Sequence, residues 1–307
     1  MTTVFLYVPS GETSPYQLGR RLYSAAYWDE TDGFEIIPIT DSTNVGDLPL
    51  AHDAIFHLTV TPWISCRPYW RWIRYFRKKG IKIITNNHGD FRIETVTALL
   101  DRDFGSALKQ SPSAILSKVI LQNSDYHIVN SSLIKNRMVD EYDIDQHTIF
   151  VIPNGLNQMG VADIPPDEHW GVSGRPLTII THGALTHQKG LVDLIGAFSS
   201  LPRGKYRLQI IGAGSAENLL RHQILDAGLE KEIGLLGAIP HPNLFKVISG
   251  ADIGVYPSHF DGFNIAALES LKCCRGPVLL SERIGLCDYL SDALKNNIFV
   301  PSPSMIA

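Results

Sequence analysis

The feature that most constrains this chain is the alternation of short apolar runs with segments of helix length. The runs are rich in valine, isoleucine and other residues that favour strands. This alternation is typical of parallel sheets covered by helices on both faces, so we predict an α/β fold. The runs lie at residues 3–8, 34–39, 53–59, 81–85, 126–130, 148–152, 177–182, 206–211, 232–236, 252–256, 276–280 and 297–300.

A break between two sets of runs predicts two domains. Pro153-Asn154-Gly155 ends the first set, and residues 157–176 after it contain several prolines and glycines and show little periodicity. The length of 307 residues also fits two domains better than one. We expect an N-terminal domain of residues 1–160 and a C-terminal domain of residues 161–307, each Rossmann-like.

Composition excludes several classes of protein. The chain has 27 Lys and Arg against 31 Asp and Glu, and 44% of its residues are hydrophobic, which excludes a disordered chain and a globally basic nucleic-acid binder. The apolar run at residues 3–8 is too short for a signal peptide or a membrane span. The four cysteines include no Cys-x-x-Cys, which argues against a zinc site and a secreted disulfide framework. We expect a cytoplasmic protein, and attachment to the cytoplasmic face of a membrane stays open.

Ligands of open α/β sheets bind beyond the carboxyl ends of the strands, so the loops that follow the runs should carry the site. These loops contain Ser10-Gly11-Glu12, Asn86-Asn87-His88-Gly89-Asp90, residues 182–190, Gly212-Ala213-Gly214 and residues 257–262. The Gly212 loop looks like the start of a dinucleotide fingerprint, but Glu217 stands where its third glycine belongs. We therefore reject an NAD site.

A set of short motifs runs through the second half in order: Gly183 with Lys189-Gly190, residues 210–214, Leu236-Gly237, Ala251-Asp252-Ile253, Pro257-Ser258, Asp261-Gly262-Phe263, Glu269 and Gly276-Pro277-Val278. This set resembles the nucleotide-sugar-binding domain of the retaining glycosyltransferases of family 4 (glycosyl transferases group 1). The first half matches more loosely, through Gly11, His88-Gly89 and residues 152–155. The resemblance implies the GT-B architecture, in which two Rossmann-like domains face each other across a cleft.

By this resemblance, the protein moves a sugar, expected to be a hexose, from a nucleotide-sugar donor to a glycan or lipid-linked acceptor with retention of configuration. A UDP-sugar is favoured as the donor over a GDP- or ADP-sugar, and no metal or other cofactor is expected. Ala184 stands where the family usually has an arginine, and Asp261 stands where it has a glutamate. These departures leave open a catalytically weakened nucleotide-sugar-binding protein that scaffolds a partner transferase. A sugar-nucleotide epimerase of the same fold is a second alternative.

Lys189 is the predicted catalytic cation. A departing nucleoside diphosphate carries negative charge, which the site must stabilise with cations or aligned N–H groups. Lys189 follows a strand at the start of a helix, where its ammonium group and the helix N-terminus can act on the same phosphate oxygens. The alternative is a solvated lysine. Arg275, Lys272 and His187 are the candidates to replace the missing arginine.

Two acids are expected beside it. Glu269 is predicted about two turns into a helix that begins near Phe263, and a carboxylate can accept hydrogen bonds from both hydroxyls of a ribose. The resemblance makes Glu269 the ribose-binding member of the family's pair of acids, and Asp261 the member that contacts the transferred sugar. For Asp261 the alternative is a turn residue before Gly262.

Further site residues are implied by the resemblance. His88 is a catalytic candidate that would face the donor sugar, and Gly11 would bring backbone N–H groups close to the diphosphate. An exposed loop residue and a plain turn are the respective alternatives. The remaining donor-binding candidates are Gly183, Gly262, Phe263, Asn264 and Gly212.

Residues 67–82 hold seven cations and no acid, interleaved with aromatic residues. At helical spacing Tyr69, Trp72, Ile73 and Phe76 form one stripe. One interpretation is a helix packed on a sheet with a solvated basic face. The other is docking of residues 67–79 on an anionic membrane surface or a phosphorylated lipid. Nucleic acid is not expected as a partner, since no stacking platform accompanies the patch.

Asp101-Arg102-Asp103 looks like the metal-binding Asp-x-Asp motif of the other large glycosyltransferase fold. It lies inside an apparent helix, residues 94–109, rather than in a loop after a strand. We therefore interpret it as helical surface and predict no catalytic metal.

Overall fold

The structure is a computed structural model of the whole chain, and two compact units make up its fold. The first comprises residues 1–95 and 105–152, and the second comprises residues 96–104 and 153–307. The residues that the structure describes are 2–7, 34–40, 42–44, 48–49, 53–60, 66–87, 89, 96–97, 99–101, 105, 108, 116–156 and 174–299. The predicted domain boundary between residues 160 and 161 lies outside them, as does most of the expected linker.

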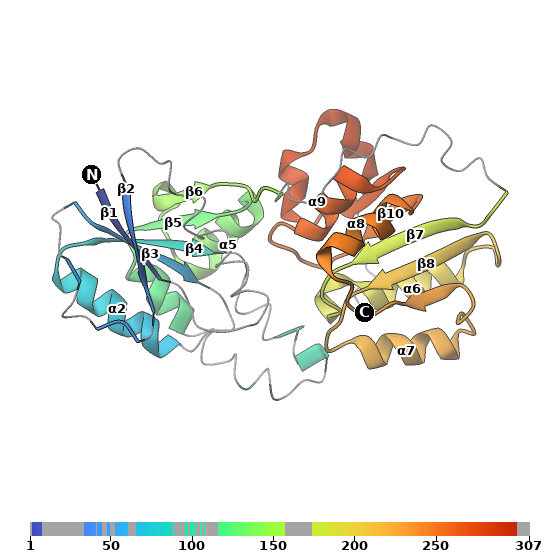
Figure 1. Cartoon of the computed structure of the whole chain (residues 1–307), viewed down its shortest axis with the longest axis horizontal. Helices are drawn as coiled ribbons and strands as arrows, with labels where there is room; N and C mark the ends of the chain where they lie inside the picture. The colour runs from blue at the N-terminus through green and yellow to red at the C-terminus, as the bar shows by residue number, and fades with distance from the viewer. Residues whose placement is uncertain are drawn as a thin grey trace. The chain divides into compact units, whose positions relative to one another are not determined.

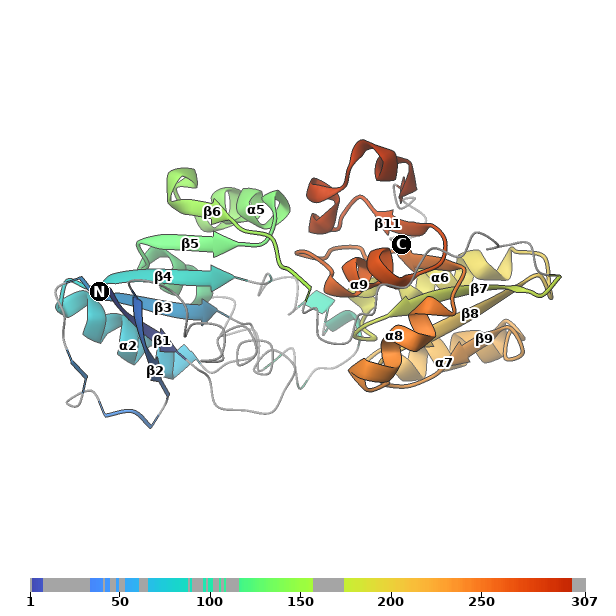
Figure 2. The same cartoon turned by 45° about the horizontal axis from the view of Figure 1, so that its top comes forward.

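The first unit is built on a parallel sheet of six strands in the order β2-β1-β3-β4-β5-β6, which Figure 2 shows side by side. Its strands are β1 (Thr2–Tyr7), β2 (Phe34–Ile39), β3 (Ile55–Val60), β4 (Lys82–Asn87), β5 (Tyr126–Val129) and β6 (Ile149–Val151). Helices α2 (Cys66–Lys78) and α5 (Ser132–Tyr142) and the short turn η3 (Gln146–Thr148) belong to this unit.

Helix α2 packs its apolar stripe against the first sheet (Figure 1). Trp72, Ile73 and Phe76 are fully buried, and the ring of Phe76 stacks on that of Phe56 in β3 at 4.4 Å between centroids. Burial of three large apolar side chains stabilises the unit by roughly 1.5–3 kcal/mol each. The predicted packing of this stripe is confirmed for these three residues. The side chain of Tyr69 lies outside the described residues.

The second unit also has a parallel sheet of six strands, in the order β12-β11-β10-β7-β8-β9. Its strands are β7 (Leu177–His182), β8 (Tyr206–Ile211), β9 (Ile233–Leu235), β10 (Ile253–Tyr256), β11 (Val278–Ser281) and β12 (Ile298–Phe299). The order of strands reverses between β7 and β10. In open α/β sheets the crevice at such a reversal, at the carboxyl ends of the strands, is where ligands bind.

Helices cover both faces of the second sheet because successive residues of a strand point to opposite sides. Ile179 packs with α6 (Leu191–Ser199) and α7 (Glu217–Asp226), whereas Ile180 packs with α8 (His241–Ser249) and the end of α9 (Ile265–Cys273). Figure 1 shows these two layers below and above the strands. Short 3-10 helices complete the unit: η4 (His187–Lys189), η5 (Gly285–Tyr289) and η6 (Asp292–Asn297).

The predicted runs correspond to the strands throughout the part of the chain that the structure describes. Each overlaps one strand, and the strand ends lie within about two residues of the predicted ends, the usual uncertainty of element boundaries. The predicted α/β fold with two Rossmann-like units is therefore confirmed. Within the described ranges, none of the helices has the length and apolar character of a transmembrane span.

Candidate functional site

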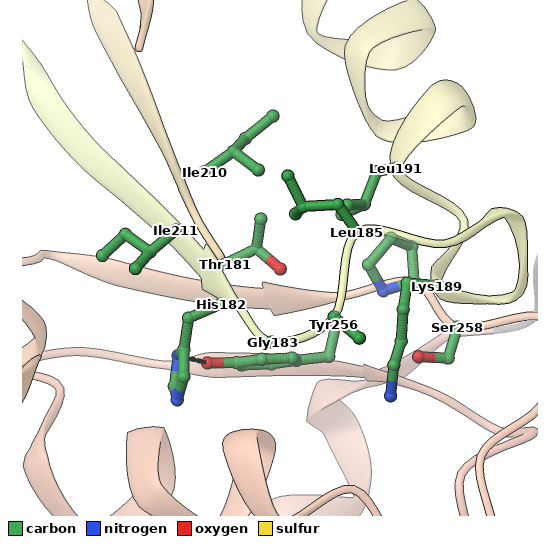
Figure 3. A pocket seen from close by; sticks show the side chains of 12 residues that line it. Thr181, His182, Gly183, Leu185, Lys189, Leu191, Ile210, Ile211, Tyr256 and Ser258 are labelled. Atoms are coloured by element: carbon green, nitrogen blue, oxygen red, sulfur yellow. Dashed lines mark hydrogen bonds between the residues drawn. The ribbon is translucent and has the colours of Figure 1, made fainter. Parts of the chain in front are cut away.

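A pocket of about 240 Å³ lies at the carboxyl ends of β7 and β10, where the strand order reverses (Figure 3). The loops after β7 and β10 and the last residues of β7, β8 and β10 form its walls. Its lining consists of Thr181, His182, Gly183, Ala184, Leu185, Lys189, Leu191, Ile210, Ile211, Tyr256, Pro257 and Ser258. Two of the predicted site residues, Gly183 and Lys189, therefore line one pocket.

The loops after β7 and β8 are held in close contact by glycine. A Cβ atom on Gly212 would lie 1.8 Å from the carbonyl oxygen of Gly183, and its φ of +140° is one that few other residues adopt. The N–H group of Gly183 donates to the carbonyl of Ile211 at 3.0 Å. Gly212 thus allows the backbones of the two loops to meet at the pocket wall, while its contact with a donor stays a prediction.

Lys189 is the last residue of η4, directly before the turn that begins α6. The turn residue Gly190 has φ of +66°, and a Cβ there would lie 2.2 Å from the carbonyl oxygen of Pro257. This close approach brings Lys189 to the loop after β10. Its ammonium group forms an ion pair with the carboxylate of Asp261, and the Lys189 side chain remains 25% exposed. Lys189 is thus a partly exposed lysine with a carboxylate partner, and its role toward a phosphate stays a prediction.

Asp261 makes the hydrogen bond of a turn residue, one of the two roles that the sequence left as alternatives, while its contact with a transferred sugar stays a prediction. One carboxylate oxygen pairs with Lys189, and the other accepts from the N–H of Phe263 at 3.2 Å, as a turn residue does. The backbone of Asp261 is tied to the loop after β11, since its N–H donates to the carbonyl of Arg283. The side chain is 13% exposed, so a charged, hydrogen-bonded carboxylate lies at the edge of the pocket.

In the family that the sequence resembles, a glycine normally follows the phenylalanine, and Asn264 stands at that position here. It has φ of +68°, a left-handed conformation that glycine favours and asparagine tolerates. Its side-chain oxygen accepts from the N–H of Ala267 at 2.9 Å and so caps α9. Asparagine can therefore replace the usual glycine here. The side chain of Phe263 packs in the core beside Tyr289, so a donor contact from Phe263 would come from its backbone.

Glu269 belongs to a buried hydrogen-bonded chain of four side chains. Its carboxylate lies 2.9 Å from Nε2 of His182, the last residue of β7. Nδ1 of His182 lies 2.6 Å from the hydroxyl of Tyr256 at the end of β10, as Figure 3 shows, and that hydroxyl lies 2.5 Å from Oγ of Ser270. Helix α9 begins at Ile265, later than the predicted beginning near Phe263. Glu269 therefore lies just over one turn from the start of the helix instead of about two.

A second histidine–carboxylate pair supports the loop around Lys189. Nε2 of His259 lies 2.5 Å from the carboxylate of Asp193 in α6, and the N–H of His259 donates to the carbonyl of Gln188. The ring of His187 meets that of His259 edge to face, with 5.5 Å between centroids. Among the three candidates to replace the missing arginine, His187 thus shares its short helix with Lys189.

Arg275 does not lie at the pocket. Its side chain donates to the carbonyl of Ser249 and its N–H to that of Ala251, both of which precede β10. These contacts place Arg275 at the amino end of the sheet, opposite the pocket. The prediction that Arg275 replaces the missing arginine is therefore wrong. Helix α9 runs from the pocket end of the sheet to the amino end, and Arg275 follows it there.

Asp101 belongs to the second unit and is bonded to two residues far along the chain in that unit. Its carboxylate accepts from the N–H of His187 at 2.8 Å and from the hydroxyl of Ser215 at 2.5 Å. Asp103 lies outside the described residues. Among the residues that the structure describes, no three histidine, cysteine or acidic side chains gather as a metal site would require. The expectation of metal-independent chemistry stays a prediction.

Two predicted site residues, His88 and Gly11, lie outside the described residues. Gly262 is buried in the loop between Asp261 and α9. Sequence reasoning missed His182, Tyr256 and Ser270. The signal that could have found them is positional: His182 and Tyr256 are the last residues of two strands predicted to end at the site.

The first unit has a smaller set of candidate features. A pocket of about 290 Å³ lies beyond the end of β4, lined by Asn87, Gly89, Leu121, Ile134, Arg137, Met138 and Tyr142. Arg74 and Lys78 on α2 and Lys79 directly after it are exposed, while Arg71 donates to the carbonyl of Thr43 and Arg77 to that of Asn123. The structure thus confirms a packed helix with an exposed basic face, and leaves membrane docking untested.

Two families of known proteins match most of the chain between them. The family described as Glycosyl transferases group 1 matches residues 167–307, and the family described as Glycosyltransferase Family 4 matches residues 51–158. An uncharacterized glycosyltransferase of Methanocaldococcus jannaschii is 28% identical over 193 residues, which are 59% of this chain and 48% of that protein. The chain spans about half the length of the curated relatives it matches.

Two solved structures share the fold over 99% of this chain and 87% of their own. Sucrose-phosphate synthase from Thermosynechococcus elongatus has a TM-score of 0.69 at 16% identity. The HepE protein of Anabaena, solved in complex with UDP-glucose, has a TM-score of 0.65 at 14% identity. At these identities the likeness concerns the fold alone.

Proposed function

Because this chain belongs to the family 4 glycosyltransferases of the GT-B fold, we propose that it transfers a sugar from a nucleotide-sugar donor to a hydroxyl group of an acceptor. The acceptor oxygen forms a bond to C1 of the sugar while the bond between C1 and the phosphate oxygen breaks. The nucleoside diphosphate leaves with the bonding electrons, and the hydroxyl proton passes to a base. The observation that carries the proposal is the grouping of Lys189, Asp261 and Glu269 around the ends of β7 and β10.

In this proposal Lys189 stabilises the charge that develops on the departing diphosphate. Its ammonium group lies at the pocket wall and already holds one carboxylate, that of Asp261. A bound diphosphate would share the ammonium group with Asp261. The carboxylate of Asp261 would then be available to accept hydrogen bonds from hydroxyls of the transferred sugar. Glu269 would accept the ribose hydroxyls, since carboxylate oxygens offer enough lone pairs to bond more than one donor.

We propose a UDP-sugar as the donor, a hexose as the transferred group and retention as the stereochemical course. The donor proposal is supported by the UDP-glucose complex of the HepE protein, which shares the fold. Retention and a glycan or lipid-linked acceptor rest on the family resemblance. His88 and Gly11 are proposed to contact the donor sugar and the diphosphate, as the resemblance implies.

The test is incubation of the protein with UDP-, GDP- and ADP-sugars that carry a labelled sugar, with and without a panel of glycan and lipid-linked acceptors. Release of the labelled sugar or its transfer, for one donor base above the others, is the expected result. NMR of the product then gives the anomeric configuration, and chelation of metals should change the rate little. A protein that neither binds nor turns over any of these donors would contradict the proposal.

A weakened nucleotide-sugar-binding protein is the second candidate, and Ala184 favours it. Ala184 lines the pocket where the family usually carries an arginine. Donor binding without turnover, together with activity gained by Ala184→Arg, would support this candidate, because a guanidinium can bind two phosphate oxygens at once. An isomerised donor in the same assay would instead indicate an epimerase.

A further inference from the structure

The hydrogen bonds behind Glu269 join four side chains in one line. An ionised Glu269 only accepts, so Nε2 of His182 carries the proton that points toward it. With a neutral imidazole, which has a single N–H, Nδ1 of His182 accepts from the hydroxyl of Tyr256, and that hydroxyl accepts from Ser270. In either protonation state of the imidazole, the N–H on Nε2 is the group that holds the carboxylate.

This chain is enclosed by the protein on one side and meets the pocket on the other. Ser270 is fully buried and Tyr256 is 2% exposed, whereas His182 and Tyr256 also line the pocket. Burial raises the pKa of Tyr256 well above its usual value, although its hydrogen bond with Ser270 opposes this shift. The phenol therefore keeps its proton at any ordinary pH, so it stays a neutral hydrogen-bonding partner of His182.

A carboxylate that binds two neighbouring hydroxyls must keep its plane fixed to within about 10–20°. Glu269 has three rotatable side-chain bonds, and the last of them sets the orientation of the carboxylate plane. The position of Glu269 on α9 does not by itself fix this rotation. The N–H of His182 approaches one carboxylate oxygen at 2.9 Å and so sets that rotation. The same oxygen has a second lone pair for a ligand.

We propose that His182, Tyr256 and Ser270 are positioning residues that hold the carboxylate of Glu269 in the orientation that accepts both hydroxyls of a nucleotide ribose. This inference rests on the proposed function, in which Glu269 is the ribose acceptor. The three residues touch no reacting atom. They act through Glu269, and their effect should appear in how the protein recognises the ribose.

The experiment measures ribose recognition by calorimetry. UDP, GDP and ADP are titrated first, and the tightest of them is then compared with its 2′,3′-dideoxy form. The ratio of the two dissociation constants is the ribose preference. We expect a preference of roughly tenfold to hundredfold in the wild-type protein, the size expected for hydrogen bonds to a charged group. Glu269→Gln should lower it.

Tyr256→Phe is the decisive variant because it removes one oxygen atom and keeps the buried ring. We expect it to reduce the ribose preference at least threefold while the affinity for the dideoxy nucleotide changes by less than about twofold, since the ring contacts remain. His182→Leu should abolish most of the preference, and His182→Gln, which restores an N–H donor, should recover part of it. Tyr206→Phe, at the amino end of β8, is the matched control and should leave the preference unchanged.

The outcomes separate the inference from the proposed function. Wild-type protein that binds none of the nucleotides would contradict the proposed function itself. Wild-type protein that binds nucleotide without a ribose preference would overturn the inference and leave sugar transfer standing. A folded Tyr256→Phe protein with the full preference, even with a lowered Tm, would also overturn it, because the chain would then be structural only. If Tyr256→Phe does not fold, Ser270→Ala makes the same test at the end of the hydrogen-bonded chain farthest from Glu269.

Discussion

The two units differ in the charge of the polar groups that they bury. Among the residues of the first unit that the structure describes, the buried polar side chains of the sheet are neutral, and the cations of α2 lie on its exposed side. In the second unit, buried or partly buried carboxylates lie beside a cation or a histidine: Asp252 beside Arg175, Asp261 beside Lys189 and Glu269 beside His182. Desolvating a charge is costly unless partners compensate it. In the second unit, these partners therefore offset the cost of desolvating the carboxylates.

Within the second unit, the pairs lie at opposite ends of the sheet. Asp252 precedes β10 and accepts two hydrogen bonds from Arg175 at 2.7 and 2.8 Å and one from the N–H of Thr178. Burial opposes ionisation of Asp252, yet these hydrogen bonds hold its pKa below the usual value. Lys189 and Glu269 lie at the other end, beside the pocket. We therefore expect the first pair to act on stability, and we propose the second set for ligand binding.

The largest effect is expected at Lys189. Lys189→Ala should lower turnover by roughly 10²–10³, the typical loss for one electrostatic stabiliser of a developing charge. Kinetics of sugar transfer check this, with Lys246→Ala on the exposed surface of α8 as the control. A Lys189→Ala protein as active as the parent would show that the buried charges of the second unit do not serve the leaving group.

Asp252→Asn should act on stability instead. Removing the charge leaves the guanidinium of Arg175 without its bidentate partner, and because Arg175 is partly exposed we expect a loss of about 2–4 kcal/mol in the free energy of unfolding. Urea unfolding measures the loss. Nucleotide affinity of the folded fraction should not change, and a large change in that affinity would break the division between the two ends of the sheet.

His127 tests the first unit. It is 1% exposed, bonds the hydroxyl of Thr85 at 2.7 Å, and burial lowers its pKa to about 4. Between pH 6.5 and pH 4 the unfolded chain binds a proton that the folded chain does not, so stability should fall by up to about 3 kcal/mol as the pH drops through this window.

Urea unfolding of the parent and of His127→Asn across that range isolates this contribution. Asparagine can keep a hydrogen bond to Thr85 but does not titrate, so its stability should depend less on pH over the same window. Parallel curves for the two proteins would refute the role given to His127.

The smallest effect per residue concerns α2, whose basic face we propose as a contact for anionic lipid. Each exposed cation should contribute about 1 kcal/mol to binding at such a surface. Reversal of Arg74, Lys78 and Lys79 to Glu should abolish binding to vesicles that contain phosphatidylserine, and added salt should release the parent protein. Reversal of Lys205, Lys231 and Lys246 makes the same change of charge in the second unit and should have little effect. Equal binding to neutral vesicles would leave only a solvated helix face.

Much of the site could be predicted because its residues stand in short motifs at strand ends. Lys189 and Asp261 were predicted separately and form an ion pair, since both follow strands that end at the reversal of strand order. Arg275 was placed wrongly because its distance from the pocket depends on the direction in which α9 returns. The sequence interpretation of Asp101 as helical surface missed its partners because His187 and Ser215 lie far along the chain.

The sequence by itself determined the alternation of strands and helices, the apolar stripe of α2, and the order of the site motifs. These depend on local periodicity and on residue types at short spacing, which each segment carries within itself. Only the tertiary structure decided that His182 lies against Glu269 and that Tyr256 lies behind His182. Those partners are 87 and 74 residues apart, and they meet because β7 and β10 are neighbours in a sheet whose strand order no local pattern encodes.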